Sequence, residues 1–410
     1  MSEFLERPAE PITTVVDTSE ALNSTLDALA GGTGPVAFDA ERAHGHRYFP
    51  KAYLFQLRRA GSGTHLVDPI AFEVEGHTDL SSLVDAVDGA EFIVHAASQD
   101  LPCMVDDQIV PASIFDTELT ARLLNYPGVG LAALLEHHFG VKLRKAHSAD
   151  NWSTRPLPEQ WLDYAALDVE LLVELRDRLA AELDAAGKTH WARQEFDHLL
   201  DSAQHPGPPP AEPWRRLSGL SDVRTRRGLA VARSLWHTRD TICRELDRPP
   251  GRLLPDAGIT QLAAKVTETG PLPGRSAVRE VEQFSYRGAR RHLSDWLAAI
   301  AAVDAEEPSH WPKRRADQAG VGQPRSWQRH HPDAWERWQA VRPAVDARAA
   351  ELDVPPANLV APGILRDVTF HAPDDVAAAL TEQGARPWQV DLVADTIRDA
   401  LTITPEAEPA

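Results

Sequence analysis

Cysteines and long apolar runs are both scarce in this chain. Only two of its 410 residues are cysteine, Cys103 and Cys243, and they lie far apart in the sequence. This scarcity argues against a disulfide scaffold or a cysteine-rich zinc site and favours a reducing compartment. No apolar run approaches the roughly 18 residues that a membrane-spanning helix needs. The acidic N-terminus also lacks the features of a signal peptide, so we expect a cytoplasmic protein with no membrane partner.

Positive charge is scarce as well, but it is unevenly distributed. The formal net charge is −19, which would argue against nucleic-acid binding if it were spread evenly over the chain. Residues 1–200 carry −17 and residues 301–410 carry −7, whereas residues 214–300 carry +7, almost all of it from arginine. A basic middle segment between acidic neighbours is typical of a nucleic-acid contact that the overall charge conceals.

The first two hundred residues alternate strand-like and helix-like patterns. Apolar runs of strand length occur at 35–40, 53–59, 64–69 and 91–96, and helical patterns occur at 78–88, 98–107, 117–125, 130–139 and 158–187. Strands early and helices late predict a mixed α/β domain with one central sheet. We place this domain at residues 1–203 and a proline-rich linker at 204–214.

The remainder of the chain reads as almost entirely helical and contains an internal repeat. The stretch "RELDRPPGRLLPDAGI" (244–259) matches "AELDVPPANLVAPGI" (350–364), with Glu-Leu-Asp-x-Pro-Pro aligned. In each copy a helix runs into the Glu-Leu-Asp, the two prolines end it and another helix follows. The repeat predicts two related helical domains at 215–303 and 330–410, with a connector at 304–329.

A buried-looking strand ends in two acids in the stretch "PVAFDAERAHG" (35–45). Side chains two residues apart on a strand share a face, so Asp39 and Glu41 project together and repel each other unless a cation lies between them. A strand that simply ends in solvent is one interpretation. A divalent metal site is the other, because Mg²⁺ and Mn²⁺ prefer oxygen ligands.

Further acids and a tyrosine follow later in the chain. Asp100 comes after the apolar run 92–94, where it could also be an ordinary acid at the start of a helix. Tyr164 and Asp168 lie four residues apart in a helical pattern and therefore share a face. A tyrosine in such a stripe is more often a core residue than a catalytic one.

The order and spacing of these residues resemble the DEDD superfamily of 3′-to-5′ exonucleases, in the branch with tyrosine in its third motif. Within it, "DAERAHGHRYFPKAYLFQLRRAGSGTHLVDP", "VHAASQDLPCM", "FDTELTARLLNYP" and "STRPLPEQWLDYAALDVELL" are similar to the ribonuclease D family. Residues 215–303 resemble the helicase-and-RNase-D C-terminal (HRDC) domain. The resemblance implies a ribonuclease H-like exonuclease domain with a mixed central sheet, followed by two all-α HRDC-type domains.

The resemblance also implies a chemistry. Asp39, Glu41, Asp100 and Asp168 match the family's four metal-binding acids, and Tyr164 matches its water-positioning tyrosine. We expect two divalent cations, Mg²⁺ or Mn²⁺, and stepwise hydrolysis of RNA 3′ ends that releases 5′-nucleoside monophosphates. Precursors of transfer RNA are the family's usual substrate, and a monomer is expected. A 3′-to-5′ DNA exonuclease of repair and a catalytically idle RNA-binding scaffold are the alternatives.

Contacts to nucleic acid are harder to assign from the residues. Gln56 and Arg58 alternate along a strand and could face the RNA backbone, and His95 ends the strand before Asp100. Arg239 and Arg244 belong to an arginine cluster that could neutralise phosphates, with Trp236 or Tyr286 stacking on bases. A solvated strand face, a core histidine and arginines paired with nearby acids are the corresponding structural interpretations. The helical domains could also pack on the catalytic domain without binding RNA.

Overall fold

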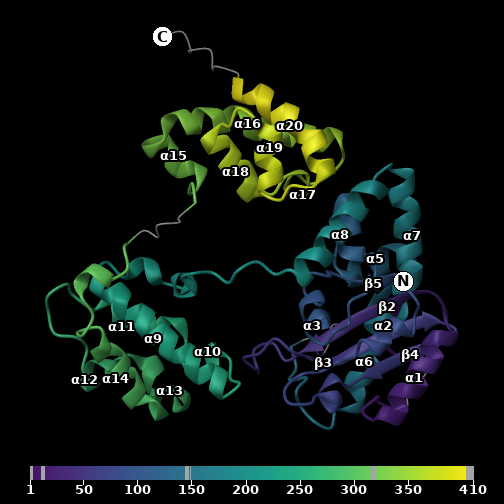
Figure 1. The fold of residues 1–410 in the computed structure, drawn as a ribbon, viewed down its shortest axis with the longest axis horizontal. Coiled ribbons are helices and arrows are strands. Elements are labelled where there is room, and N and C mark those ends of the chain that lie inside the picture. Colours follow the sequence, from purple (N-terminus) through teal and green to yellow (C-terminus); the bar gives the residue numbers. More distant parts are fainter. Residues whose placement is uncertain (1–2, 11–13, 144–146, 148, 315–319, 403–410) are drawn as a thin grey trace.

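A five-stranded sheet forms the centre of the N-terminal domain in this computed structural model, which describes residues 3–10, 14–143, 147, 149–314 and 320–402 (Figure 1). The strands are β2 (Thr33–Arg42), β3 (Ala52–Ala60), β4 (Gly63–Val67), β5 (Phe92–Val94) and β6 (Ile114–Asp116). Their order is β4-β3-β2-β5-β6; β2 pairs antiparallel with β3 and parallel with β5. The expected mixed sheet is confirmed. A separate parallel pair joins β1 (Glu3–Leu5) to β7 (Val141–Leu143).

Strand β2 lies in the middle of this sheet, and both of its faces are covered. Val36, Ala37 and Phe38 are all fully buried. The Phe38 ring packs against Phe55 at 5.3 Å and Phe92 at 5.9 Å between ring centroids, on the face opposite Asp39. Burying such a ring contributes about 1.5–3 kcal/mol. The apolar half of β2 therefore fixes the strand that carries the first two acids.

Eight helices surround the sheet in the described part of this domain. They are α1 (Ser19–Gly31), α2 (Ser82–Asp85), α3 (Leu101–Asp106), α4 (Thr117–Leu123), α5 (Leu131–Phe139), α6 (Glu159–Glu170), α7 (Leu172–Ala185) and α8 (Thr189–Gln204). Helix α6 packs across β2, β3 and β4, and α7 packs against β2 and β5. Together they cover the face of β2 that bears Asp39 and Glu41.

Two of the predicted helices differ in the structure. The pattern at 158–187 forms two helices, because the chain bends at Leu171, where φ is −116° and ψ is 13°. The bend lets the chain follow the twisted sheet from β4 towards β5, which one straight helix would not do. The pattern at 78–88 yields only the four-residue helix α2. Helices α1 and α8 and strands β1, β6 and β7 were not predicted.

The middle helical domain has a hydrophobic core of its own. Its principal helices are α9 (Arg226–Glu245), α10 (Pro250–Leu253), α11 (Asp256–Ala264), α12 (Arg275–Glu280), α13 (Arg287–Arg291) and α14 (Leu293–Ala302). Trp214 is buried in this core with Trp296, although the linker was predicted to extend to residue 214. Residues 205–211, which follow α8, are exposed and without regular structure, as the proline-rich sequence predicts.

The C-terminal domain is also helical, but its core is continuous with that of the exonuclease domain. It contains α15 (Pro324–His330), α16 (Pro332–Glu351), α17 (Pro356–Leu359), α18 (Pro362–His371), α19 (Val376–Glu382) and α20 (Pro387–Thr402). Trp388 stacks on Trp191 with 4.9 Å between ring centroids. Oxygen Oε1 of Glu195 accepts hydrogen bonds from Trp388 Nε1 at 2.9 Å and Arg386 Nε at 2.7 Å. The last domain is therefore packed on helix α8.

Three predicted segments extend beyond the described residues: the start of the first domain, the connector at 304–329, which includes 315–319, and the end of the last domain after residue 402. Within the described ranges, none of the helices combines the length and the apolar character needed to cross a bilayer.

Candidate active site

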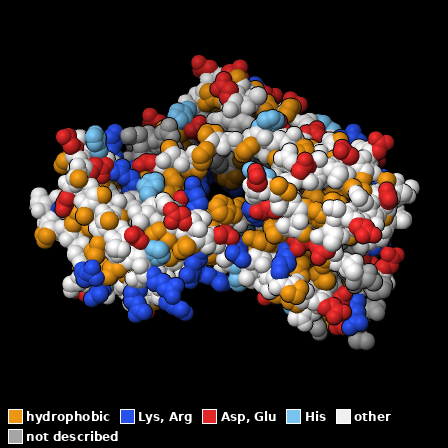
Figure 2. Space-filling model, turned by 60° about the horizontal axis from the view of Figure 1, so that its bottom comes forward, with side chains coloured by type: hydrophobic (Ala, Val, Ile, Leu, Met, Phe, Trp, Pro, Cys, Tyr) orange, Lys and Arg blue, Asp and Glu red, His pale blue; other side chains and the backbone are white. Residues whose placement is uncertain are grey.

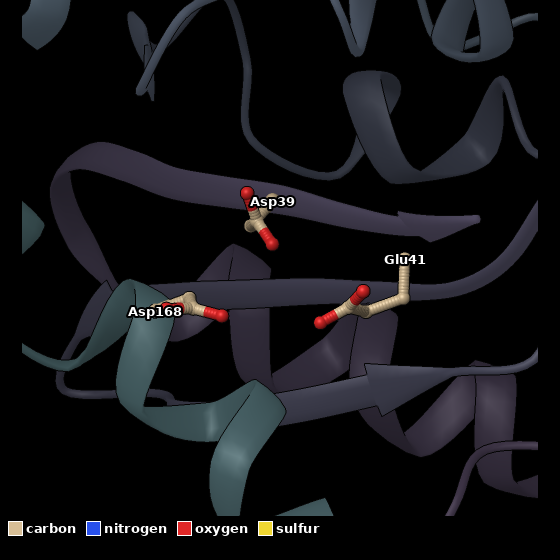
Figure 3. Close-up of side chains that lie close together, drawn as sticks. All are labelled: Asp39, Glu41 and Asp168. Atoms are coloured by element: carbon tan, nitrogen blue, oxygen red, sulfur yellow. The ribbon is translucent and has the colours of Figure 1, made fainter. Parts of the chain in front are cut away.

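Three acids predicted as metal ligands converge on one point above the sheet (Figure 3). Asp39 and Glu41 project from the same face of β2, and Asp168 reaches them from α6. One ligand atom from each residue can be chosen so that all three lie within 4.8 Å of one another. Carboxylates this close repel each other strongly, so the arrangement requires protons or cations.

The environment of these acids favours neutralisation. Burial, the largest cause, raises the pKa of Asp39 from 3.8 to about 6. Burial and the charges of Asp39, Asp168 and Asp100 raise the pKa of Glu41 from 4.5 to about 10. Burial, followed by the charge of Asp39, holds the pKa of Asp168 well above its ordinary value. A set of buried oxygen ligands with this excess of negative charge fits a divalent cation of the Mg²⁺ or Mn²⁺ class.

Asp100 belongs to the same electrostatic site. It is 4% exposed, and burial together with the negative charge of Asp39 raises the pKa of its carboxyl. Asp100 precedes α3, but its side chain makes no capping hydrogen bond, so the ordinary role of an acid at a helix start does not explain it. It lies outside the tight group of three, although its charge contributes to the raised pKa values of Glu41 and Asp168.

Asp116 positions the loop that carries Asp100, a role that the sequence reasoning missed. It ends β6, and its oxygens accept hydrogen bonds from the backbone nitrogens of Ala96 at 3.0 Å and Ala97 at 2.8 Å. The same carboxylate caps α4 by accepting from Glu118 N and Leu119 N. The sequence indicated its importance only through its place in "FDTELTARLLNYP", one of the stretches that resemble the ribonuclease D family.

Arg42 is a second residue that was missed, and it brings a cation to the acids. It follows Glu41 directly, and its Nη2 lies 3.6 Å from Oδ1 of Asp100. The guanidinium also donates to the carbonyl and the side-chain oxygen of Gln99. Its positive charge lowers the pKa of Asp39, Glu41 and Asp100 and so partly opposes the effect of burial. The side chain is 19% exposed and can be approached from solvent.

Tyr164 lies one turn before Asp168 on α6. Burial and the charges of Asp168 and Glu41 raise its pKa, because ionising the phenol would add another negative charge to this site. Its ring meets that of His147 edge to face, with 5.7 Å between centroids. Tyr164 therefore keeps its proton at neutral pH and can donate a hydrogen bond.

Gln56 and Arg58, predicted to touch RNA, lie on the face of β3 that α6 covers. Gln56 pairs with Asp39 across β2 and β3 and is fully buried; its amide has no hydrogen-bond partner among the described residues. Arg58 donates to Thr64 at 2.9 Å and lies 3.6 Å from Glu170. Neither side chain forms the solvated strand face considered from the sequence, because α6 covers that face.

His95 is half-buried and hydrogen-bonded inside the exonuclease domain. Its Nδ1 lies 2.9 Å from the Thr117 hydroxyl, and burial lowers its pKa to about 4, so the ring is neutral at physiological pH. The hydrogen bond agrees with the structural interpretation of His95, and its contact with RNA stays a prediction.

The predicted arginine contacts on α9 are largely engaged inside the protein. Arg239 is 5% exposed and binds Asp256 at 2.7 Å and the Leu254 carbonyl at 2.8 Å, so the expectation that it contacts phosphate is not supported. Arg244 is exposed, but it pairs with Asp240 at 3.1 Å and lies beside the Tyr48 ring. Burial of apolar helix faces places arginines of this helix against acids and carbonyls, which the charge count alone does not reveal.

A different set of arginines forms the free basic surface of the middle domain. Five exposed arginines on or beside α12 and α13 have no ion pair within the described ranges: Arg275, Arg279, Arg287, Arg290 and Arg291. Tyr286 lies among them and is 44% exposed. Figure 2 shows Lys and Arg side chains gathered at the lower left, on this domain. We call these six residues the basic surface.

Comparisons with known proteins agree with this arrangement. Residues 13–184 match a family model described as a 3′-5′ exonuclease, and residues 228–300 match the HRDC domain. Residues 320–401 match a different model, the 3′ to 5′ exonuclease C-terminal domain. Ribonuclease D of Acidiphilium cryptum is 30% identical over 307 residues, which cover 73% of this chain and 76% of that one.

The chain belongs to the ribonuclease D family. It is a 3′-5′ exoribonuclease, as the recognised sequence pattern predicts. A second member, ribonuclease D of Escherichia coli K12, is 30% identical over 239 residues, 57% of this chain and 61% of that one.

Solved structures support the same fold. A protein from Bifidobacterium adolescentis is 35% identical, with a TM-score of 0.86 over 98% of this chain and all of that one. The crystal structure of Escherichia coli RNase D superimposes with a TM-score of 0.70 at 22% identity, covering 96% of this chain and all of that one. The exonuclease sheet and the helical region after it are thus both features of the ribonuclease D fold.

Proposed function

We propose that this exoribonuclease hydrolyses the last phosphodiester of an RNA 3′ end with two divalent cations held by Asp39, Glu41, Asp100 and Asp168. The observation that carries the proposal is the convergence of Asp39, Glu41 and Asp168 within 4.8 Å. The negative charge of Asp100 adds to theirs and raises the pKa of Glu41 further. When bound, cations of the Mg²⁺ or Mn²⁺ class activate a water molecule and stabilise the charge on the scissile phosphate and the leaving oxygen.

The chain's own groups orient the reactants around that centre. The four carboxylates would hold the cations in place of protons, and the positive charge would offset the mutual repulsion that burial intensifies. Tyr164 donates a hydrogen bond that orients the attacking water, since its raised pKa excludes it as a base at neutral pH. Arg42 stands on the exposed side of Asp100 and supplies positive charge towards an incoming phosphate.

The proposed substrate is a structured RNA such as a transfer RNA precursor, shortened by one 5′-nucleoside monophosphate at a time. The basic surface on α12 and α13 supports this proposal, because its five arginines, which form no ion pair with the residues that the structure describes, and its exposed tyrosine suit phosphates and an unstacked base. We further propose a cytoplasmic monomer. Its two cysteines are buried and free, which fits a reducing compartment.

The direct test is to incubate the purified protein with 5′-labelled RNA and with DNA of the same sequence, with and without Mg²⁺. We expect a ladder that shortens from the RNA 3′ end only when the cation is present. Equal or faster shortening of DNA would instead support the DNA-repair alternative. RNA binding without any shortening, in Mg²⁺ and in Mn²⁺, would support the scaffold alternative and reject the catalytic proposal.

A further inference from the structure

The repeated Glu-Leu-Asp-x-Pro-Pro segment forms the same turn in both helical domains. Asp247 and Asp353 end their helices in the left-handed backbone region, with φ of 44° and 51°. In each turn the next residue closes back on the helix: Arg248 N donates to Cys243 O at 2.9 Å, and Val354 N donates to Ala349 O at 3.0 Å. This backbone arrangement stops the helix and is rarely adopted by residues other than glycine and asparagine.

Both turns bind the exonuclease domain through the aspartate, and we call them the docking turns. In the C-terminal domain, Oδ1 of Asp353 accepts from Asn125 Nδ2 at 2.8 Å, and its carbonyl accepts from Lys188 Nζ at 2.8 Å. In the middle domain, Oδ1 of Asp247 accepts from the backbone nitrogens of Tyr48 at 2.9 Å and Phe49 at 3.2 Å. One sequence feature therefore serves two interfaces.

The first docking turn holds the loop that directly follows the catalytic strand. This β2–β3 loop, residues 43–51, extends from the exonuclease domain towards α10 (Figure 1). Besides the two backbone contacts, Arg47 Nη1 lies 3.4 Å from Oδ2 of Asp247. The Tyr48 hydroxyl donates to Asp240 at 2.7 Å. Asp247 thus binds a loop that begins two residues after Glu41.

The same loop contacts the segment that packs on Tyr164. Arg47 Nε donates to the Ser153 hydroxyl at 2.8 Å, and His46 Nε2 lies 3.3 Å from the carbonyl oxygen of Ala149. The carbonyl oxygen of His147 accepts a hydrogen bond from Nε1 of Trp152, the neighbour of Ser153, at 3.2 Å, and the His147 ring meets the Tyr164 ring edge to face. A continuous series of contacts therefore joins the middle helical domain to the catalytic tyrosine.

We propose that Asp247 is a positioning residue for catalysis: it fixes the β2–β3 loop and, through the segment that bears His147 and Ser153, the orientation of Tyr164. The middle domain then contributes to the chemical step as well as to RNA binding. The inference rests on the proposed function for the role of Tyr164.

The test separates chemistry from RNA binding by using a substrate too small to reach the helical domain. The p-nitrophenyl ester of uridine 5′-monophosphate contains one nucleotide, and its hydrolysis is followed by absorbance in Mn²⁺. In the full-length protein we expect Asp247→Ala to lower kcat about 3- to 30-fold, the range of typical coupling energies, with KM changed less than about twofold. Asp247→Asn keeps a side-chain oxygen for the two backbone nitrogens and should restore most of kcat.

Asp353→Ala is the matched control, because it removes the equivalent aspartate from the other docking turn without touching the β2–β3 loop. Its kcat on the ester should equal that of the wild type. An unchanged kcat for Asp247→Ala, or an equal loss for Asp353→Ala, would overturn the inference. Should Asp247→Ala fail to fold, Tyr48→Phe removes the hydroxyl that donates to Asp240 and accepts from Arg244 but keeps the ring, and kcat must then fall with KM unchanged. Lack of wild-type activity would instead reject the proposed function.

Discussion

The carboxylate of Asp116 lies 2.8 Å from the backbone nitrogen of Ala97 and holds the loop that leads to Asp100. Replacing this acid by alanine leaves the backbone nitrogens of Ala96 and Ala97 without their acceptor and frees the loop; it also removes the cap of α4. We expect Asp116→Ala to lower kcat about 10- to 100-fold, as other losses of supporting partners around metal sites do. Steady-state hydrolysis of labelled RNA measures this, and activity equal to wild type in a folded variant would contradict the positioning role.

Neutralising one acid of the cluster should separate activity from stability. Asp39→Asn or Asp168→Asn should reduce RNA hydrolysis by more than about 100-fold, because a ligand is removed rather than a supporting partner. In the absence of divalent metal the same variants should unfold at a temperature equal to or above that of wild type, since a repulsion is removed. Calorimetry in a chelator checks the second expectation. Full activity under saturating Mg²⁺ would reject the assignment of these ligands.

The stability of the metal-free protein should depend on pH in a definite direction. The folded-state pKa is raised from 3.8 to about 6 for Asp39 and from 4.5 to about 10 for Glu41. The folded protein therefore binds more protons than the unfolded chain between about pH 4 and pH 10, so its free energy of unfolding falls as pH rises.

A cation replaces these protons, so the increase in melting temperature on adding Mg²⁺ should be larger at pH 8 than at pH 6. Thermal melts at both pH values measure it. Glu41→Gln should bring the increases in melting temperature at pH 8 and pH 6 closer together. An increase that is the same at both pH values in the wild type would contradict the replacement of protons by the cation.

Tyr164 should contribute one oriented hydrogen bond and no charge. We expect Tyr164→Phe to lower kcat about 10- to 100-fold, the usual effect of removing a hydrogen bond to a charged group. The alkaline limb of the pH–rate profile should keep its position, because the raised pKa of the phenol leaves it protonated in wild type. A limb that moves in the variant would show instead that Tyr164 titrates during turnover.

The basic surface should control RNA affinity and its salt dependence. Replacing Arg287, Arg290 and Arg291 by alanine should weaken RNA binding and make its salt dependence shallower, by about 0.7 for each phosphate of a single strand that is no longer neutralised. Binding titrations at several salt concentrations measure both quantities. Arg226→Ala is the control, because Arg226 binds carbonyls of its own domain, including Trp311 at 2.6 Å, and should leave the slope unchanged. An unchanged salt dependence in the triple variant would show that RNA binds to another surface of the protein.

The predictable parts of this protein are those encoded by local periodicity and spacing. Alternation along β2 placed Asp39 and Glu41 on one face, and the four-residue spacing placed Tyr164 beside Asp168 on α6. Both arguments need only the geometry of a single element. The same reasoning located four strands of the main sheet and the proline-rich linker.

The parts that escaped prediction depend on contacts between distant segments. Arg239 counts as a positive charge in the sequence, and only the fold reveals its pairing with Asp256. Asp116 reads as an ordinary helix cap, although it also binds Ala96 and Ala97. The repeat was visible, but its use as two docking turns was not, because the partners of Asp247 and Asp353 lie about 200 residues away in sequence.

The packing of the C-terminal domain on α8 has a consequence for biosynthesis. Trp388 completes the environment of Glu195, and 193 positions separate them in sequence. Domains generally fold as units while the chain is still being made, at about 5–20 residues per second. One side of α8 will therefore lack its partner for roughly ten seconds or more after the exonuclease domain has been translated. The middle domain has a separate core and can fold during this time. The part of the enzyme that is translated first is in this sense among the last to be complete.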